Sequence, residues 1–271
     1  KEKALPEGPE CRRMAHQLAE RVSNRTIKSI EIVSGRYTKK PIENIEKFED
    51  DLPIKIQGAG VHGKFIFFLL NSQWSIWNTL GMTGSWSSDL KKHSRVKFCL
   101  DEGELYYNDQ RNFGTLKFVQ GKQPLVKKLS SLGPDLLAEE CSNRDFAERL
   151  AKKHNKTIAE AIMDQSVLSG VGNYVKAEAL YLAKISPNRI VSDLTSDEIV
   201  LLNKTTRSVL VNSFESGGAT IKSYADFYGD TGNATDRFLV YGKKFDPNGN
   251  PVVKEKTADK RTTHWVPKVQ N

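Results

Sequence analysis

The sequence predicts an α+β protein: an N-terminal β-sandwich with a flanking helix, then a helical domain that ends in a β-hairpin. Short apolar runs separated by turn residues fill positions 26–119, helical periodicity follows, and strand patterns return near the C-terminus. Many short strands without alternating helices are typical of a sandwich or barrel. At 271 residues the chain is long enough for two domains with separate cores.

The N-terminal domain is expected over residues 1–122. It opens with an amphipathic helix, in which Met14, Leu18 and Val22 recur at fourfold spacing opposite basic and polar residues. The strands after it are indicated by polar–apolar alternation or by continuous apolar runs, with glycine-containing turns between them. The clearest elements are the helix at 9–22 and the strands at 26–32, 65–70 and 96–100.

Residues 123–142 are interpreted as the connection to a second domain at 143–271, since glycine and proline interrupt them repeatedly. Shorter helices are predicted at 145–153, 157–163 and 173–184. A capping box at Thr195–Glu198 opens a longer helix, and Gly217 and Gly218 end it. The last segment returns to strands around a turn at 246–249.

The charge favours a polyanionic partner. Lysine and arginine number 41 against 33 acidic residues, for a net charge of +8. Residues 241–271 hold seven basic residues and three acidic ones, so much of the excess lies there. A charge run is also typical of an ordinary solvated face, so it supports nucleic-acid binding only together with other features.

Cysteine usage argues against a metal site or a disulfide framework. Cys11, Cys99 and Cys141 are isolated, with no paired spacing among them. The longest apolar run has six residues, far below the roughly 20 that cross a bilayer, and no signal peptide is visible. We therefore expect a protein without cofactor, without metal and without a membrane partner, located inside the cell in the cytoplasm, nucleoid or nucleus.

Five motifs follow one another in an order that matches one known family. They are Pro6–Glu10, Gly63–Lys64, Asp109–Gly114, Leu132–Asp135, and Met163–Gln165 continuing through Gly170–Tyr174 to Glu178–Leu180. On these motifs the chain resembles the formamidopyrimidine-DNA glycosylase and endonuclease VIII family of bifunctional base-excision repair enzymes, from Pro6 to the C-terminus. The resemblance implies a helix-two-turn-helix element in the C-terminal domain. It implies damaged double-stranded DNA, or single-stranded DNA, as the partner of a monomer.

The resemblance makes Pro6, Glu7 and Lys64 the expected catalytic residues. A proline at a chain terminus carries a secondary amine, which suits imine formation with a sugar carbon, and a neighbouring carboxylate can move protons. The resemblance also makes Lys64, Asn173 and Arg261 the expected phosphate contacts. At Asn173 a helix begins, and its exposed backbone N–H groups would suit a phosphate. The plainer alternatives are a solvated lysine at 64 and an ordinary helix corner at 170–172.

The resemblance implies that three further side chains fill the space left by an everted base. An apolar wedge props open a base step and a guanidinium can pair with the orphaned base, which fits Met82, Arg111 and Phe113. The alternative is that Met82 and Phe113 belong to the core.

The C-terminal segment departs from the commonest form of the family, a four-cysteine zinc finger. Residues 239–271 contain no cysteine and resemble the zincless finger of the Nei-like branch, with Arg261 in the place of the hairpin arginine. His264 has no partner ligands for a metal. Residues 217–236 resemble a lesion-capping loop, although a stretch so rich in glycine and polar residues is equally typical of a mobile surface loop.

Leu5 precedes Pro6, and this creates a second hypothesis. While Leu5 is attached, the nitrogen of Pro6 is an amide and cannot act as a nucleophile. A chain that keeps residues 1–5 would then be a catalytically blocked protein that binds DNA or lesions, or would use another amine, such as that of Lys1. Removal of residues 1–5 would restore the enzyme. The preferred lesion and the opposite base do not follow from the sequence.

Overall fold

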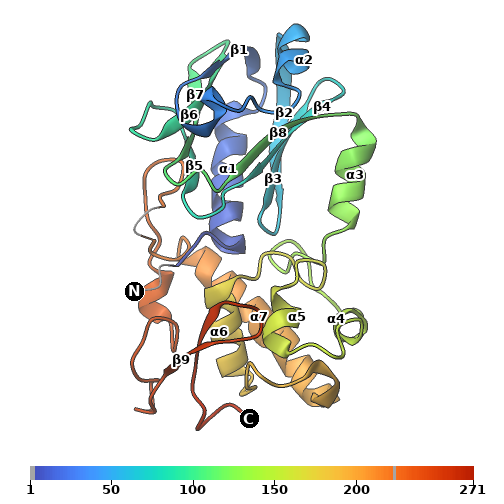
Figure 1. Ribbon diagram of the computed structural model, residues 1–271, viewed down its shortest axis with the longest axis vertical. Helices are drawn as coiled ribbons and strands as arrows, with labels where there is room; N and C mark the ends of the chain where they lie inside the picture. The colour runs from blue at the N-terminus through green and yellow to red at the C-terminus, as the bar shows by residue number, and fades with distance from the viewer. Residues whose placement is uncertain (1–3, 222–223) are drawn as a thin grey trace. The chain divides into compact units, whose positions relative to one another are not determined.

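The structure is a computed structural model that describes residues 4–221 and 224–271 (Figure 1). The chain forms two compact units, each described by itself. The sandwich unit comprises Glu10–Ser131 and Ile221–Thr231. The helical unit comprises Lys1–Pro9, Leu132–Thr220 and Gly232–Asn271. Residues 4–9 therefore cluster with the C-terminal helices, and residues 221 and 224–231 of the predicted capping loop cluster with the strands.

The sandwich unit is built on an eight-stranded antiparallel sheet. Its order is β5-β7-β6-β1-β2-β3-β4-β8. The strands are β1 (Thr26–Ile32), β2 (Ile54–His62), β3 (Phe65–Leu70), β4 (Trp74–Thr79), β5 (Gly84–Ser87), β6 (Ser94–Leu100), β7 (Glu104–Asp109) and β8 (Thr115–Gln120). Pairing between β1 and β2 is limited to Thr26 with Lys55 and Ile27 with Ile54, so the two halves of the sheet join over a short stretch.

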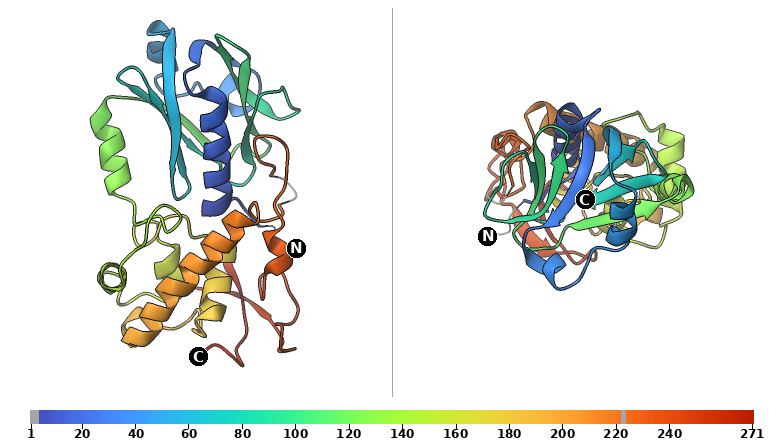
Figure 2. Two further views of the ribbon diagram at one scale, coloured as in Figure 1. Left: turned by 180° about the vertical axis from the view of Figure 1, so that it is seen from behind. Right: turned by 90° about the horizontal axis from the view of Figure 1, so that it is seen from above.

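Aromatic side chains pack between the two halves of the sheet. Phe68 of β3 packs against Trp86 of β5 with ring centroids 5.2 Å apart, and Phe98 of β6 lies 6.3 Å from Phe118 of β8. Such aromatic pairs bury large apolar areas and stabilise a core beyond that burial. The predicted β-sandwich is confirmed, and its halves can be followed in Figure 2.

Helix α1 (Gly8–Val22) supplies the flanking helix. Met14, Leu18 and Val22 are fully buried, as their spacing predicted. The remaining helices of this unit are η1 (Gly35–Thr38), α2 (Ile45–Asp50) and α3 (Lys122–Ser130). Helix α3 lies in the segment interpreted as the connection, and none of its residues is buried.

The helical unit contains α4 (Asn143–Ala151), α5 (Ile158–Met163), α6 (Asn173–Leu182) and α7 (Ser196–Glu215), with short helices η2 (Val191–Asp193) and η3 (Ala234–Arg237). The predicted capping box at Thr195 is confirmed, and Thr157 forms a second one. Helix α6 is the most buried of these elements, with every residue from Asn173 to Tyr181 inside.

The C-terminal hairpin consists of β9 (Val253–Lys256) and β10 (Thr262–Trp265). The turn predicted at 246–249 exists, since the Asp246 carboxylate accepts hydrogen bonds from the backbone N–H groups of Asn248 and Asn250. However, it carries only an isolated bridge between Phe245 and Pro251. The expected strands flank residues 257–261 instead, where the side chains of Thr257 and Thr263 can pair across the ladder.

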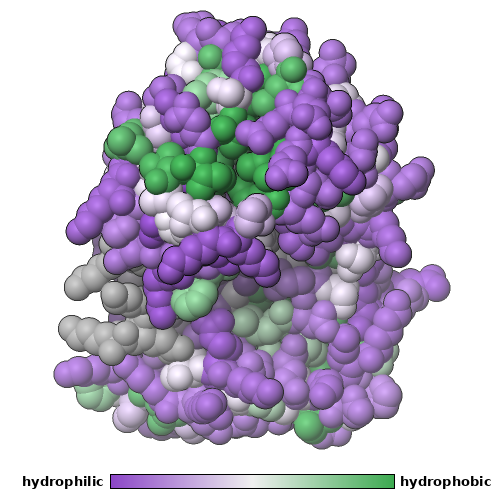
Figure 3. All heavy atoms as spheres, turned by 45° about the horizontal axis from the view of Figure 1, so that its top comes forward, coloured by the Kyte–Doolittle hydropathy of each residue, from purple (hydrophilic) through white to green (hydrophobic). Residues whose placement is uncertain are grey.

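In the described residues no helix is long and apolar enough to cross a membrane. The face shown in Figure 3 is mostly hydrophilic, with one group of hydrophobic side chains among polar neighbours.

Candidate functional site

Glu7 is held at the beginning of helix α6. Its carboxylate accepts hydrogen bonds from the backbone N–H groups of Gly172 (2.8 Å), Tyr174 (2.7 Å) and Val175 (3.2 Å). The first N–H groups of a helix have no partner within the helix and attract anions, so this position suits a carboxylate. Only 2 % of Glu7 is exposed. The carboxylate next to Pro6 is therefore fixed in place.

Two glycines make this arrangement possible. A Cβ on Gly172 would lie 2.3 Å from the carboxyl carbon of Glu7, so no other residue fits there without displacing Glu7. Gly8 donates its N–H to the carbonyl of Gly170 at 2.8 Å, which places the N-terminal segment directly against the turn before α6. Pro6 itself is buried. The glycine-rich turn thus positions the Pro6–Glu7 pair.

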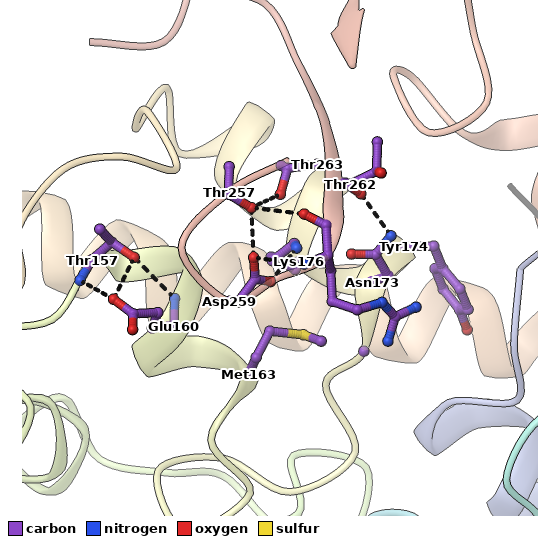
Figure 4. A network of polar contacts seen from close by, with 12 residues as sticks. Thr157, Glu160, Met163, Asn173, Tyr174, Lys176, Thr257, Asp259, Thr262 and Thr263 are labelled. Atoms are coloured by element: carbon purple, nitrogen blue, oxygen red, sulfur yellow. Dashed lines mark hydrogen bonds and ion pairs between the residues drawn. The ribbon is translucent and has the colours of Figure 1, made fainter. Parts of the chain in front are cut away.

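Three of the N–H groups expected to face a phosphate, those of Gly172, Tyr174 and Val175, are bonded to Glu7 instead. The phosphate contact of Asn173 stays a prediction. The Asn173 side chain is 4 % exposed, and its Nδ2 donates to the carbonyl of Thr262 in β10 at 2.8 Å (Figure 4). Asn173 therefore connects helix α6 to the hairpin. Arg261 lies in the hairpin turn and is half-buried.

The three candidate void-filling residues lie on two turns of the sandwich unit. Met82, between β4 and β5, is half-buried. Phe113, between β7 and β8, is 56 % exposed, and the guanidinium of Arg111 lies 4.9 Å from its ring centroid. Phe113 is therefore not a core residue, which removes the alternative for that position.

Asp109 and Thr83 join these two turns; Asp109 begins one of the motifs found in the sequence, whereas Thr83 was missed. The Asp109 carboxylate accepts hydrogen bonds from Thr83 Oγ1 at 2.5 Å and from the N–H of Gly114 at 2.8 Å. Thr83 Oγ1 in turn accepts the N–H of Arg111 at 2.9 Å. The turn that carries Met82 and the loop that carries Arg111 and Phe113 are thus one connected structure. The signal in the sequence was an aspartate at a strand end, a residue that commonly bonds backbone N–H groups in turns.

Two arginines support the same loop from other elements. Arg36 of η1 donates to the carbonyl of Asn112 at 2.9 Å, and Arg95 of β6 donates to the carbonyl of Asp109 at 2.8 Å. Because arginine presents several donors in a fixed plane, each can hold an irregular backbone segment that has no ladder partner.

Lys64 lies in the turn between β2 and β3, where Gly63 has a left-handed φ of +59°. Its side chain is half-buried. In the part of the chain that the structure describes, its ammonium makes no hydrogen bond or ion pair. The cation therefore remains available for an anionic ligand.

The described end of the predicted capping loop packs on helix α1. Asp226 is 2 % exposed and accepts hydrogen bonds from Arg13 Nε at 2.8 Å and Gln17 Nε2 at 2.9 Å. Burial raises the pKa of Asp226, but the bonds from Gln17 and Arg13 outweigh it and leave the pKa below its usual value. Tyr224 donates its hydroxyl to the carbonyl of Glu10 at 3.0 Å. Residues 222 and 223 of this loop lie outside the described residues, as does Lys1, the alternative amine.

The hairpin contains a buried histidine. His264 is 1 % exposed, and its Nδ1 accepts the N–H of Gly242 at 3.3 Å. Burial, with the charges of Lys254 and Lys176, lowers the pKa of His264 to about 4. Within residues 4–221 and 224–271, no group of three or more His, Cys, Asp or Glu side chains is arranged to hold a metal ion.

The candidate residues fall into two sets. Pro6, Glu7, Asn173 and Arg261 belong to the helical unit, and Lys64, Met82, Arg111 and Phe113 belong to the sandwich unit. The first set joins a carboxylate to a hairpin through helix α6. The second set consists of apolar and cationic side chains on turns of the sandwich unit.

Three family models match the chain along its length. They describe the formamidopyrimidine-DNA glycosylase N-terminal domain over residues 5–116, the H2TH domain over 132–225 and the C-terminal domain over 230–271. Curated relatives include formamidopyrimidine-DNA glycosylases from Bacillus licheniformis, 34 % identical with 98 % of this chain and 99 % of the relative covered, and from Halalkalibacterium halodurans, 32 % identical with 96 % and 98 % covered. The Nei-like character of the finger stays a prediction.

Solved structures agree. The MutM (Fpg) protein from Thermus thermophilus is 30 % identical, with a TM-score of 0.86 and 98 % of both chains covered. The Lactococcus lactis Fpg in complex with DNA containing an abasic site is 28 % identical, with a TM-score of 0.86 and 98 % of this chain and 99 % of that chain covered. The fold, the order of domains and the similarity over nearly the whole length lead to one conclusion: this chain belongs to the formamidopyrimidine-DNA glycosylase family.

Proposed function

We propose that the protein is a bifunctional DNA glycosylase and AP lyase that excises oxidised bases from duplex DNA. One observation carries the proposal: the carboxylate of Glu7 adjoins Pro6 and is fixed by three backbone N–H groups of α6. The carboxylate also caps helix α6, but only an enzyme needs a proton-transferring group beside Pro6. The family relationship supplies the reaction class.

The proposed chemistry begins with a free nitrogen on Pro6, which requires cleavage of the bond between Leu5 and Pro6. The nitrogen lone pair forms a bond to C1′ of the damaged nucleotide, the base leaves with the electrons of its glycosidic bond, and the proton on the alkylated Pro6 nitrogen passes to the departing base. Glu7 donates a proton to the sugar ring oxygen, which opens the ring and leaves an iminium between Pro6 and C1′. Proton removal from C2′ then expels the 3′ phosphate, and a second elimination expels the 5′ phosphate.

DNA binding is assigned to the remaining candidates. Lys64 and Arg261 contact phosphates. In support, the Lys64 ammonium has no partner among residues 4–221 and 224–271. Asn173, which connects α6 to β10, contacts a phosphate of the same DNA strand. Met82, Arg111 and Phe113 fill the space of the everted base, which the 56 % exposure of Phe113 favours. The protein acts as a monomer, and the loop at residues 217–236 caps the lesion.

The test uses two forms of the protein, one that begins at Pro6 and one that keeps residues 1–5. Each is incubated with a duplex containing a formamidopyrimidine-type guanine lesion, the kind of DNA crystallised with a Lactococcus lactis FPG mutant. The proposal expects free base and strand ends with phosphate on both sides from the form that begins at Pro6. Tight lesion binding without base release by both forms would favour a DNA-binding protein instead.

A further inference from the structure

Helix α6 holds the C-terminal finger, residues 239–271, at three points. The Glu178 carboxylate accepts the backbone N–H groups of Leu239, Val240 and Tyr241 at 2.8, 2.9 and 2.7 Å. Asn173 holds β10, as described above. The third point is an ion pair between Lys176 and Asp259 (Figure 4). Asp259 lies in the same turn between β9 and β10 as Arg261.

The Lys176–Asp259 pair is almost completely buried. Lys176 Nζ lies 2.5 Å from Asp259 Oδ2, and the two side chains are 0 % and 5 % exposed. The pKa of Lys176 lies below its usual value, because the effect of burial outweighs the hydrogen bond and the charge of Asp259, which raise the pKa. A buried charge is costly unless it is paired. If Asp259 moved away, the Lys176 ammonium would be buried without a partner, which would destabilise the fold. The ion pair therefore fixes the turn to the helix.

The other oxygen of Asp259 organises the turn itself. Oδ1 accepts the hydroxyl of Thr257 at 2.5 Å and the backbone N–H of Arg261 at 3.4 Å. The carbonyl of Arg261 accepts the N–H of Thr257 at 3.0 Å. Lys260 adopts a left-handed φ of +63°, which completes the reversal. The backbone N–H of Arg261 thus bonds Asp259 directly, and its carbonyl bonds Thr257, whose hydroxyl is held by Asp259.

We propose that Lys176 and Asp259 are positioning residues for DNA binding, because their ion pair holds the turn that presents the Arg261 guanidinium to a phosphate. Asp259 also neutralises Lys176, so that a second cation can stand beside it. The inference rests on the proposed phosphate contact of Arg261. According to this inference, a side-chain ion pair anchors a hairpin that contains no cysteine.

The test is a double-mutant cycle on duplex DNA affinity, measured between 50 and 200 mM salt. Arg261→Ala should weaken binding about tenfold and reduce the slope of log affinity against log salt by about 1. Asp259→Asn should produce the same two changes. The combination of both substitutions should bind like Arg261→Ala alone, because the aspartate acts through the arginine. Lys176→Arg, which keeps the charge, should retain more affinity than Lys176→Met.

Glu198→Gln is the control for a general loss of stability. It removes the 3.0 Å ion pair with Arg189 and part of a capping box elsewhere in the helical unit. It should leave the salt slope unchanged. If Asp259→Asn does not fold, Lys176→Met combined with Asp259→Leu leaves no buried charge and should fold. That variant should still bind like Arg261→Ala.

The outcomes separate the two claims. If Arg261→Ala has no effect on affinity or slope, its phosphate contact is wrong and the inference is overturned with it. If Arg261→Ala has its effect while Asp259→Asn binds like the unmodified protein, or adds its full effect to that of Arg261→Ala, only the positioning role is overturned.

Discussion

The carboxyl carbon of Glu7 lies 2.3 Å from the point where a Cβ on Gly172 would be, and the N–H of the same glycine donates to that carboxylate at 2.8 Å. A residue near the N-terminus thus determines which residue can precede helix α6, more than 160 positions later. The glycine-rich turn therefore holds the carboxylate of the proposed catalytic site and is not only a helix corner.

Gly172→Ala should displace Glu7 and reduce base release, although it changes no catalytic side chain. Glu7→Gln should reduce base release by about 100-fold or more, because a general acid contributes on that order. Both variants should bind lesion duplex with nearly unchanged affinity, which gel-shift titration measures beside single-turnover excision. Normal excision by Gly172→Ala would show that Glu7 is not held in the way described.

Phe113→Ala should slow excision and weaken the preference for lesion duplex over undamaged duplex, because the wedge supports eversion. Binding to undamaged DNA should change little. Val126→Ala is the matched control, since Val126 is 58 % exposed on helix α3 and stands outside the proposed interface. Equal excision rates for the Phe113 variant and the control would contradict the role of Phe113.

The stability of the helical unit should fall as pH decreases from about 6.5 to 4. An unfolded histidine titrates near 6.5, whereas the pKa of folded His264 is about 4, so the unfolded state binds more protons in this window. The free energy of unfolding should drop by up to about 3 kcal/mol below pH 4. It is constant, for this group, above pH 6.5.

Denaturant titrations at pH 4 to 7 measure this dependence. His264→Phe, which keeps a ring next to Tyr241 and cannot titrate, should flatten it, while His154→Gln at an exposed position should leave it unchanged. A dependence that survives His264→Phe would assign the titration to other groups.

Much of the fold could be predicted because periodicity and caps are local. The spacing of Met14, Leu18 and Val22 identified α1, and Thr195 with Glu198 identified the start of α7. The hairpin was placed too early, because Asp246–Gly249 is a good turn sequence whose strands do not extend beyond one bridge. Local turn preference does not determine how far a ladder continues.

The candidate site could be predicted as residue types but not as contacts. Glu7 and the start of α6 are far apart in the sequence, so nothing local indicated that the carboxylate would occupy the N–H groups assigned to a phosphate. The same holds for Asp109 with Thr83 and for Lys176 with Asp259. A lysine inside an apolar helix was the only visible sign of the last pair.

The central claim is that Pro6 is the nucleophile, and borohydride trapping followed by mass mapping tests it most directly. A protein that begins at Pro6 is incubated with lesion or abasic duplex and reduced, and the adduct is digested. The account predicts a covalent adduct on the Pro6 nitrogen, and no adduct at Pro6 when residues 1–5 remain attached. An adduct on another amine of the form that begins at Pro6, or no adduct with any lesion or abasic duplex, would contradict it.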